Sequence, residues 1–446
     1  MLNCMKDQPK VGDKHFRKIV SQRNADGTIV ETVYSAKEQC TKFAIYCNGG
    51  LSIDTSHSIP SGKKVEPVPA SNNLIRHGAV IFAEKPEDFE NVHKLIADIQ
   101  AYIYRYLDIS DHFLKIASYY ILLSWVYDAF NELPYLRLRG DYGSGKTRAL
   151  FIIGSLCQKA FFASGASTVS PIFHTLDTFR GTLIFDEADF RFSDEKSELV
   201  KIFNNGNVRG FPVLRTAITV NKVFDPCAFS VFGPKIVAMR KAFDDPALES
   251  RFLTEEMGQK KMRKDIPINL PDRQKEEALS LRNQLLMYRF QTLSKIQLDD
   301  SLIDPELSPR LNQILIPLLS IIDNGDLRND IRQAVQSFDQ KLYAERSGSV
   351  EAGVLEILQD IYSNRSETKV AVSEITAAFA SRFSGEYNRP ITARVIGNVL
   401  RKRLRLVTYK SHGVYVVPFT EKPKVDELCI RYGVVDREDG GNTPSG

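Results

Sequence analysis

A glycine-rich run has the residue types and spacing of a phosphate-binding loop. Residues 140–147 read Gly-Asp-Tyr-Gly-Ser-Gly-Lys-Thr and directly follow an alternating apolar stretch, residues 135–139. The glycines allow backbone N–H groups to close around phosphate oxygens, the lysine reaches the outer phosphates, and the threonine hydroxyl can ligate Mg²⁺. The residues expected to bind ATP and its Mg²⁺ are Gly140, Gly143, Ser144, Gly145, Lys146 and Thr147.

An apolar run that ends in two carboxylates lies downstream of this loop. Residues 181–185 read Gly-Thr-Leu-Ile-Phe, and Asp186 and Glu187 follow them. In a phosphate-loop nucleotidase such a run is a buried parallel strand, whose Asp holds Mg²⁺ through water and whose Glu polarises the attacking water. We therefore expect Asp186 to hold the metal and Glu187 to be catalytic. The alternative is a sandwich strand with an exposed acidic end, and the position after the loop favours hydrolysis.

Apolar periodicity predicts the elements that must position these residues. Residues 85–132 carry apolar side chains at helical spacing, which predicts two or three helices that lead into the core. A second apolar strand is expected at residues 234–240. The polar, turn-rich first part of the chain contains short strand-like pieces such as residues 42–46. The pattern is that of an α/β chain.

Composition excludes several classes of protein. The 446 residues are 43% hydrophobic, which suffices for several cores, and the length suggests two to four domains. Neither end has the apolar core of a signal sequence. The most apolar stretches, residues 119–127 and 314–322, are too short to span a bilayer, so we expect packed helices and no membrane association. Six scattered cysteines match neither a zinc site nor a disulfide framework, which favours a reducing cytoplasm.

The C-terminal part resembles a winged helix, because three helices precede a two-stranded hairpin. We expect helices near residues 350–360, from Ser373 and at residues 391–402, with a short strand at 369–372 and hairpin strands at 406–410 and 414–417. In the third helix the expected packing face is Ile391, Val395, Ile396, Val399 and Leu400.

Basic residues gather on this third helix and hairpin. Seven basic residues and no acidic one lie between Arg389 and Lys410, a local excess that the net charge of +4 conceals. Clustered cations favour contact with nucleic-acid phosphates. The alternative is a protein-docking winged helix with a solvated basic face. The residues expected to contact DNA here are Arg394, Arg401, Lys402 and Lys410.

The segment after the second strand suggests a family. Residues 244–253 read Asp-Asp-Pro-Ala-Leu-Glu-Ser-Arg-Phe-Leu. With the loop and the acidic strand they resemble an AAA+ ATPase of the branch that contains the minichromosome maintenance helicases, where a Leu-x-Ser-Arg-Phe run carries an arginine finger. The resemblance implies that Arg251 reaches the γ-phosphate held by a neighbouring subunit. Alternatively, Arg251 is a helix-surface cation paired with Glu249 or Asp245.

The same resemblance implies two further catalytic arginines. Arg240 falls where such ATPases place a sensor of the γ-phosphate, although an arginine there departs from the family. Arg310 lies at the start of an apolar helix where the family has a second sensor arginine, and Pro309 fits the first turn of that helix. Arg310 could equally be a solvated residue at a helix start.

A β-hairpin is expected between the two core strands. Within residues 210–224, apolar and polar residues alternate on either side of a polar tip, Asn221-Lys222. In the related helicases a hairpin at this position projects into a central channel and carries a basic residue that grips DNA. By that resemblance Lys222, helped by Arg215 and Arg209, contacts phosphates without sequence preference. The alternative is a solvent-exposed turn that has no role in DNA binding.

The resemblance implies an α/β fold with an AAA+ parallel-sheet ATPase core, a helical lid, a C-terminal winged helix and a small N-terminal domain. The expected parts are a polar N-terminal domain with short strands (1–84), a helical linker region (85–132), the ATPase core (133–257), the lid (258–346), the winged helix (347–432) and a flexible tail (433–446).

The expected function is that of an ATP-dependent DNA helicase or translocase. By resemblance it acts as a homo-oligomeric ring, a hexamer, in replication of a mobile element or phage. An alternative is a DNA-bound ATP switch, such as a replication initiator or helicase loader, without processive unwinding. A DEAD-type helicase, suggested by residues 186–189, is disfavoured because no Gln-x-x-Gly-Arg-type run follows residue 257.

Overall fold

The computed structural model describes most of the chain in two compact units, residues 1–332 and 333–446. The described residues are 16–59, 62–186, 194–218, 224–241, 243, 245–259, 262–347, 350–364, 368–383 and 392–434. The division falls within a single helix, α10 (Gly325–Ser347). The finer six-part division expected from the sequence stays a prediction.

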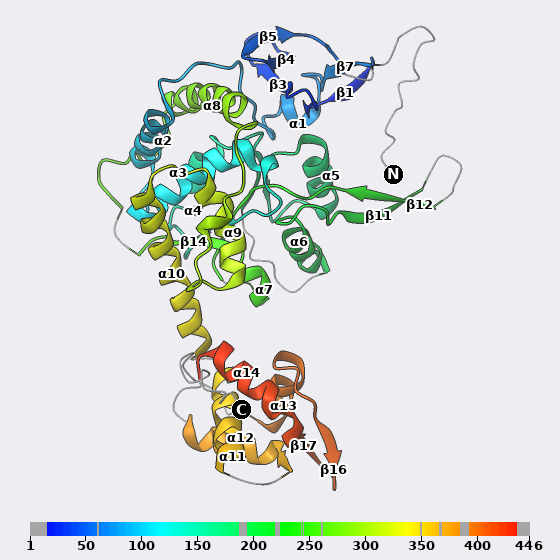
Figure 1. Ribbon diagram of the computed structural model, residues 1–446, viewed down its shortest axis with the longest axis vertical. Helices are drawn as coiled ribbons and strands as arrows, with labels where there is room; N and C mark the ends of the chain where they lie inside the picture. Colours follow the sequence, from blue (N-terminus) through cyan, green and yellow to red (C-terminus); the bar gives the residue numbers. More distant parts are fainter. Residues whose placement is uncertain are drawn as a thin grey trace. The chain divides into compact units, whose positions relative to one another are not determined.

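A five-stranded parallel sheet forms the centre of the first unit (Figure 1). Its strands are β8 (Tyr135–Arg139), β9 (Phe161–Ser164), β10 (Leu183–Asp186), β13 (Lys235–Met239) and β14 (Phe252–Glu256). Their order is β14-β8-β13-β10-β9, and every neighbouring pair is parallel. The strands expected at 135–139, 181–187 and 234–240 are confirmed. Because the carboxyl ends of parallel strands meet at one edge, the residues that follow β8, β10 and β13 lie along the same edge.

Helices cover this sheet. On one side of the unit α2 (Val92–Tyr106), α3 (Asp111–Val126) and α8 (Arg273–Thr292) pack together, whereas α5 (Val169–Phe179) and α6 (Asp194–Asn205) lie on the other (Figure 1). Asn91 and Ser110 cap the first two helices by accepting hydrogen bonds from backbone N–H groups of the first turn. The helices expected between residues 85 and 132 are therefore confirmed.

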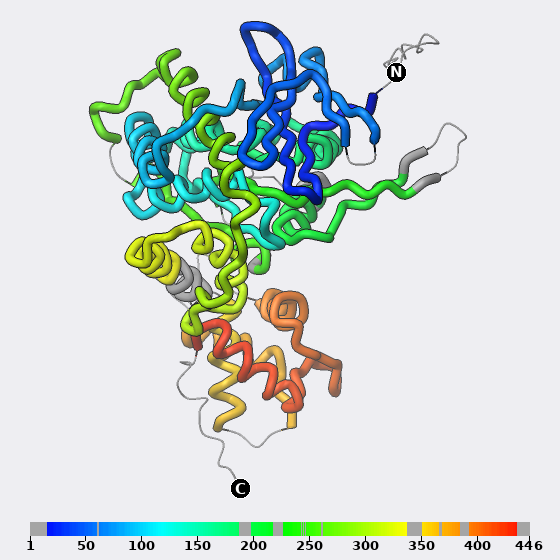
Figure 2. The backbone as a smooth tube through the Cα atoms, turned by 45° about the horizontal axis from the view of Figure 1, so that its top comes forward, coloured from blue at the N-terminus to red at the C-terminus, as the bar shows by residue number. Residues whose placement is uncertain are grey.

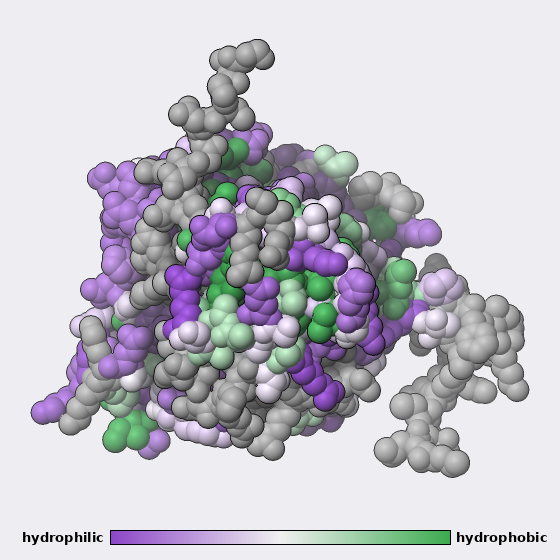
Figure 3. Space-filling model, turned by 90° about the horizontal axis from the view of Figure 1, so that it is seen from below, coloured by the Kyte–Doolittle hydropathy of each residue, from purple (hydrophilic) through white to green (hydrophobic). Residues whose placement is uncertain are grey.

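The two most apolar stretches are packed helices, as expected. α3 is buried almost all round, and α9 (Pro309–Ser320) buries one apolar face. Among the residues that the structure describes, no helix combines the length and the apolar character needed to cross a membrane. The face shown in Figure 3 carries both hydrophilic and hydrophobic residues.

The N-terminal part consists of two small sheets. The first has the order β2-β3-β4-β5 and is antiparallel, and the second has the order β1-β7-β6. Their strands are β1 (Arg17–Ile19), β2 (Ser21–Arg23), β3 (Ile29–Ser35), β4 (Cys40–Cys47), β5 (Gly50–Asp54), β6 (His57–Ser58) and β7 (Lys64–Pro67), followed by the short helix α1 (Asn73–Arg76). The expected strand at residues 42–46 is confirmed within β4.

Buried ion pairs join these sheets to the rest of the unit. The carboxylate of Glu31 on β3 accepts hydrogen bonds from Arg289 Nε on α8 (2.7 Å) and from Lys159 Nζ (3.0 Å). Arg289 also pairs with Asp128 at 2.7 Å. The side chains of Glu31, Arg289 and Lys159 are each at most 5% exposed. The N-terminal sheets are thus built into the first unit through charges that would be costly to bury alone.

The expected hairpin between the core strands is confirmed. β11 (Val213–Ile218) and β12 (Phe224–Phe229) pair antiparallel, and Figure 2 shows them extending away from the body of the first unit. The tip with Lys222 lies outside the described residues.

The second unit contains the helices and hairpin expected from the sequence. In order they are α11 (Val350–Asn364), β15 (Lys369–Ala371), α12 (Val372–Arg382), α13 (Ala393–Asn398) with a π-helical turn at Val399–Arg403, β16 (Tyr409–Ser411), β17 (Val414–Pro418) and α14 (Lys422–Tyr432). The three strands form a sheet of order β15-β17-β16. α14, which was not expected from the sequence, contacts α11 and buries Val425 and Cys429.

Three details of this unit differ from expectation. α12 begins at Val372 rather than Ser373, and the first hairpin strand begins at Tyr409 rather than residue 406. Val395 was expected to pack but is 40% exposed, because the buried stripe follows the spacing i, i+3, i+4 from Ile396 to Val399 and Leu400. Ile391 lies outside the described residues.

Candidate nucleotide-binding site

The glycine-rich loop joins β8 to α4 (Lys146–Gly154). Gly143 and Gly145 have φ values of 71° and 88°, and Gly145 caps the helix. These left-handed conformations favour glycine, and they let successive N–H groups face one concave side, at the positive end of the helix. Lys146 Nζ lies over the loop, where it donates to the carbonyls of Gly140 (2.6 Å) and Asp141 (2.7 Å) and approaches Ser144 Oγ at 3.3 Å. The segment has the geometry of a phosphate cradle.

The two residues expected to hold the metal lie in direct contact. Thr147 Oγ1, in the first turn of α4, donates to Asp186 Oδ2 at the end of β10 over 2.7 Å. Hydroxyl and carboxylate oxygens are the ligands that Mg²⁺ prefers, so these residues fit that metal. A bound Mg²⁺ would neutralise phosphate charge here. Glu187, the expected catalytic carboxylate, lies outside the described residues.

Arg240 lies on the same edge of the sheet as the loop. It follows β13, and its guanidinium carbon is 3.6 Å from the centroid of the Tyr142 ring, which belongs to the loop. A cation over an aromatic face is attracted by the ring quadrupole. The contact places a positive charge beside the phosphate cradle of the same chain.

A pocket of about 490 Å³ adjoins the loop. Residues 106–110, 141–145 and 255–259 line it, together with Arg148 and Met262. Hydrogen bonds tie its walls together: Glu255 accepts from Ser110 N (2.7 Å) and Ser110 Oγ (2.8 Å), and Asp108 Oδ2 accepts from Arg263 N (2.9 Å). Burial raises the pKa of Glu255. The volume is in the range of small-molecule sites. No sequence pattern indicates this pocket, because its walls come from three separate segments without a shared motif.

Arg251 lies at the opposite edge of the sheet from the loop. Its carbonyl accepts from Tyr135 N, at the amino end of β8, over 2.9 Å. The loop follows the carboxyl end of β8, roughly 16 Å away at the usual rise per strand residue. The Arg251 guanidinium donates to the Asn204 side chain and to the Ala247 carbonyl (3.0 Å). Arg251 therefore cannot serve the loop of its own chain without a rearrangement of the sheet.

Of the two expected alternative partners of Arg251, Glu249 is engaged elsewhere. Glu249 forms a buried ion pair with Arg137 on β8 and accepts from Phe243 N at 2.9 Å. Burial lowers the pKa of Arg251, and the nearby charge of Arg310 lowers it further. The charge of Asp245, the other expected partner, opposes this shift.

Arg310 shares this edge with Arg251. Ser308 caps α9 and Pro309 occupies its first turn, which confirms the expected helix start. Arg310 Nη1 donates to Gln313 Oε1, and Gln313 Nε2 donates to Glu132 Oε1, both over 3.1 Å. Burial raises the pKa of Glu132, and the charge of Arg310 opposes that shift. Two of the three expected catalytic arginines are thus neighbours, far from their own phosphate loop.

The cations expected to contact DNA differ in their surroundings. On β11, Arg215 forms two hydrogen bonds with the Glu198 carboxylate, at 2.8 and 3.1 Å. Arg209 donates to the carbonyls of Asp128 and Phe130. In the second unit the side chains of Arg394, Arg401, Lys402 and Lys410 are exposed.

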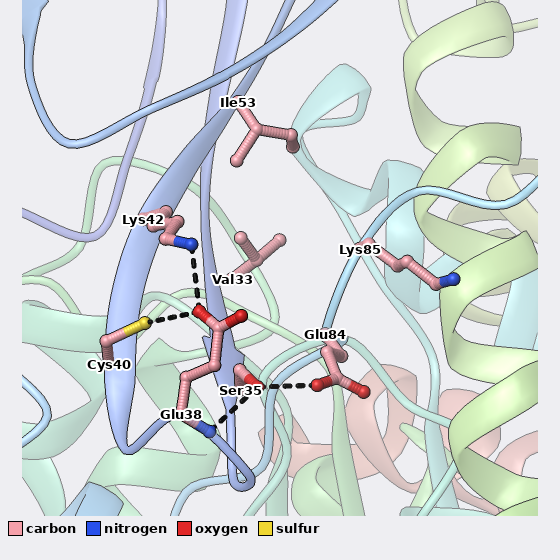
Figure 4. Close-up of a pocket in the computed structure, with 8 residues that line it drawn as sticks. All are labelled: Val33, Ser35, Glu38, Cys40, Lys42, Ile53, Glu84 and Lys85. Atoms are coloured by element: carbon pink, nitrogen blue, oxygen red, sulfur yellow. Dashed lines mark hydrogen bonds and ion pairs between the residues drawn. The ribbon is translucent and has the colours of Figure 1, made fainter.

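A further pocket, of about 310 Å³, lies at the N-terminal sheets (Figure 4). Its polar side chains mainly bond one another: Glu38 accepts from Lys42 (2.9 Å) and Cys40 (3.2 Å), and Ser35 donates to Glu84 (2.6 Å). Figure 4 shows both groups within the pocket wall. These contacts assign no chemistry to the pocket.

Comparisons with known proteins give distant structural similarities. No family model matches the sequence, and no curated protein matches it. The active helicase Cch of SCCmec type IV matches 92% of this chain and 80% of its own, with 10% identity and a TM-score of 0.43. An apo structure of the NrS-1 C-terminal region matches 87% of this chain and 96% of its own, with 10% identity and a TM-score of 0.36. The JCV helicase matches 56% of this chain and 61% of its own, with 15% identity and a TM-score of 0.24.

Proposed function

We propose that this chain is an AAA+ ATPase that acts on DNA as a helicase or translocase. The observation that carries the proposal is the contact between Thr147 and Asp186 beside the Lys146 ammonium. It joins a phosphate loop to the end of a parallel strand at the edge where α/β sheets bind ligands. ATP is the proposed nucleotide, with its phosphates at the start of α4 and its base and ribose in the pocket of about 490 Å³.

Each residue of the proposed site has a separate task. The loop N–H groups and Lys146 bind phosphate oxygens, and Thr147 and Asp186 hold Mg²⁺. Glu187 polarises the attacking water, and Arg240, held by Tyr142, senses the outer phosphate. The ribose and base contact the walls formed by residues 106–110 and 255–259.

The position of Arg251 and Arg310 supports an oligomer. Both cations lie at the amino edge of the sheet, so only the phosphate loop of a second copy can bring a triphosphate to them. An apolar pocket of about 680 Å³ adjoins Glu132 and Gln313, and its wall includes the exposed Leu298 and Ile303. The two cations are complementary to the phosphates that a second copy would carry, and the apolar surface beside them would be buried against that copy. An interface between two different edges is heterologous. Such interfaces form a closed ring when the rotation from one copy to the next returns to the first copy, and we propose that this ring is a hexamer.

DNA is the proposed polymer. The β11–β12 hairpin, with Lys222 and Arg215, would contact the backbone in a central channel, and the second unit, proposed as a winged helix, would contact it through Arg394, Arg401, Lys402 and Lys410. The proposed setting is cytoplasmic replication of a mobile element or phage. A DNA-bound ATP switch without processive unwinding is the second candidate, because the same site and the same cations would serve it.

A strand-displacement assay tests the proposal. The full chain should separate a labelled strand from a partial duplex only with ATP and Mg²⁺, and Lys146→Ala should abolish both separation and ATP hydrolysis. DNA-stimulated hydrolysis without displacement would favour the switch. A wild-type protein that neither binds nor hydrolyses ATP would contradict both.

A further inference from the structure

Two exposed tyrosines lie on opposite faces of the C-terminal hairpin, formed by β16 and β17. Tyr409 is 45% exposed and Tyr415 is 51% exposed. In the hairpin register Tyr409 pairs with Val416, and Lys410 pairs with Tyr415. Successive strand residues point to opposite faces, whereas directly paired residues share one. Tyr415 therefore shares its face with Lys410, and Tyr409 lies on the other.

A second cation reaches the Tyr415 face from the preceding helical segment. The Arg401 guanidinium carbon is 5.2 Å from the centroid of the Tyr415 ring. Arg401 also lies against Gly397 on α13, where an added Cβ would meet Arg401 Nη2 at 3.2 Å. The absence of a side chain at Gly397 leaves room for the guanidinium. Arg401, Tyr415 and Lys410 thus form one cluster, and half of the tyrosine stays in contact with solvent.

Two carboxylates of the second unit pair with cations outside this cluster. Glu351 pairs with Arg403 at 2.5 Å, and Asp426 pairs with Lys422 at 3.0 Å. On the Tyr415 face of the hairpin, Arg401 and Lys410 contribute two positive charges. The exposed Lys402 follows Arg401 directly.

We propose that Arg401, Tyr415 and Lys410 bind single-stranded DNA, with an unpaired base stacked on the Tyr415 ring. An exposed ring that shares its face of the hairpin with two cations is complementary to a ligand that combines an aromatic face with phosphates. Paired bases in a duplex are covered by their neighbours, so only an unpaired strand offers such a face. This inference rests on the proposed function and specifies that the C-terminal hairpin binds DNA in its single-stranded form.

Stacking and charge have different signatures in a binding experiment. Loss of one base–aromatic stack weakens binding by roughly 5- to 150-fold at every salt concentration. Loss of one phosphate contact instead reduces the slope of log affinity against log salt, by about 0.7 for a single strand. The ring and the cations of the cluster can therefore be tested separately.

The test is an anisotropy titration of the full chain with fluorescent oligothymidylate over a series of salt concentrations. Tyr415→Ala should weaken binding roughly 5- to 150-fold with an unchanged salt slope, and Tyr415→Phe should retain the affinity. Arg401→Gln should lower the slope by about 0.7. The matched control is Tyr409→Ala, an equally exposed tyrosine on the other face, which should bind like wild type.

Two results would overturn the inference. One is wild-type affinity in Tyr415→Ala, and the other is an equal loss in Tyr409→Ala. If Tyr415→Ala fails to fold, Tyr415→Leu retains an apolar side chain without a ring, and it should show the same loss relative to Tyr415→Phe. Duplex binding and ATP hydrolysis of each variant are measured in parallel. If Tyr415→Ala keeps its duplex binding, its ATP hydrolysis and its full affinity for single strands, this inference alone is wrong. If the wild-type protein shows neither duplex binding nor ATP hydrolysis, the proposed function is wrong.

Discussion

The hydroxyl of Thr147 donates a 2.7 Å hydrogen bond to the carboxylate of Asp186. The two residues lie far apart in the sequence, one at the start of a helix and the other at the end of a strand. Parallel pairing of β8 and β10 with β13 between them brings both to one edge of the sheet. The contact places two hard oxygen groups beside the glycine-rich loop, as the proposed hydrolytic site requires.

Removal of the Thr147 hydroxyl should impair Mg²⁺-dependent turnover. Thr147→Val preserves the shape of the side chain and removes one oxygen ligand, so we expect ATP hydrolysis to fall about 10²-fold or more, as for other single contacts that stabilise developing charge. Thr147→Ser keeps the hydroxyl and is the matched control. Phosphate release over a range of Mg²⁺ concentrations measures the effect, and wild-type turnover in Thr147→Val would rule out the assignment.

Two inactive variants should restore activity when they are mixed. Lys146→Ala lacks a nucleotide site, and Arg251→Ala lacks the cation that we place at the opposite edge of the sheet. In a mixed oligomer some interfaces combine an intact loop with an intact Arg251, so part of the hydrolysis should return. Each variant alone is the control. Mixed oligomers with no recovered activity would count against a shared site.

Arg240 should affect turnover more than ATP binding. If it acts on charge that develops at the outer phosphate, Arg240→Ala should lower kcat at least tenfold with little change in KM. Lys241→Ala, at the next exposed position, serves as the control. Tyr142→Ala should reproduce part of the loss, because the ring holds the guanidinium at 3.6 Å. Steady-state kinetics with an unchanged kcat in Arg240→Ala would exclude a catalytic role.

The buried carboxylate of Glu31 should be important for stability. Glu31→Ala leaves Arg289 and Lys159 buried without this partner, so the free energy of unfolding should fall by about 3–5 kcal/mol. Glu66→Ala, which breaks a surface pair with Lys18, should cost less than about 1 kcal/mol. Urea denaturation of both variants gives the comparison. Equal losses of unfolding free energy in the two variants would mean that the buried ion pairs of Glu31 stabilise the fold no more than a surface pair does.

The stability contributed by Asp128 should depend on pH. Burial alone would raise the pKa of Asp128, but the charge and hydrogen bonds of Arg289 outweigh burial and lower it below the ordinary value of 3.8. The folded state therefore favours the ionised form, and the contribution is present above pH 3.8 and lost as the pH falls through the lowered pKa. The difference in unfolding free energy between wild type and Asp128→Asn should be largest near neutral pH and shrink below about pH 4. A difference that stayed constant with pH would contradict this origin.

Local patterns were sufficient for most elements of the candidate site. The loop, the strands beside it and the helices before it follow from glycine spacing and apolar periodicity, because each depends on neighbours within a few residues. The β11–β12 hairpin was predicted for the same reason. Val395 was wrongly predicted to be buried, because the buried face of a helix depends on the elements that pack against it. α14 was not predicted, because its sequence has only a weak apolar pattern.

The sequence by itself determined the chemistry: a lysine and a threonine behind a glycine turn, an aspartate at a strand end, and a cluster of cations near the C-terminus. Only the tertiary structure decided which of these groups meet. Strand order placed Thr147 against Asp186 and put Arg251 on the far edge, and the hairpin register separated Tyr415 from Tyr409. The physical reason is that such contacts join segments distant in the chain, and their pairing depends on the packing of the whole unit rather than on any local pattern.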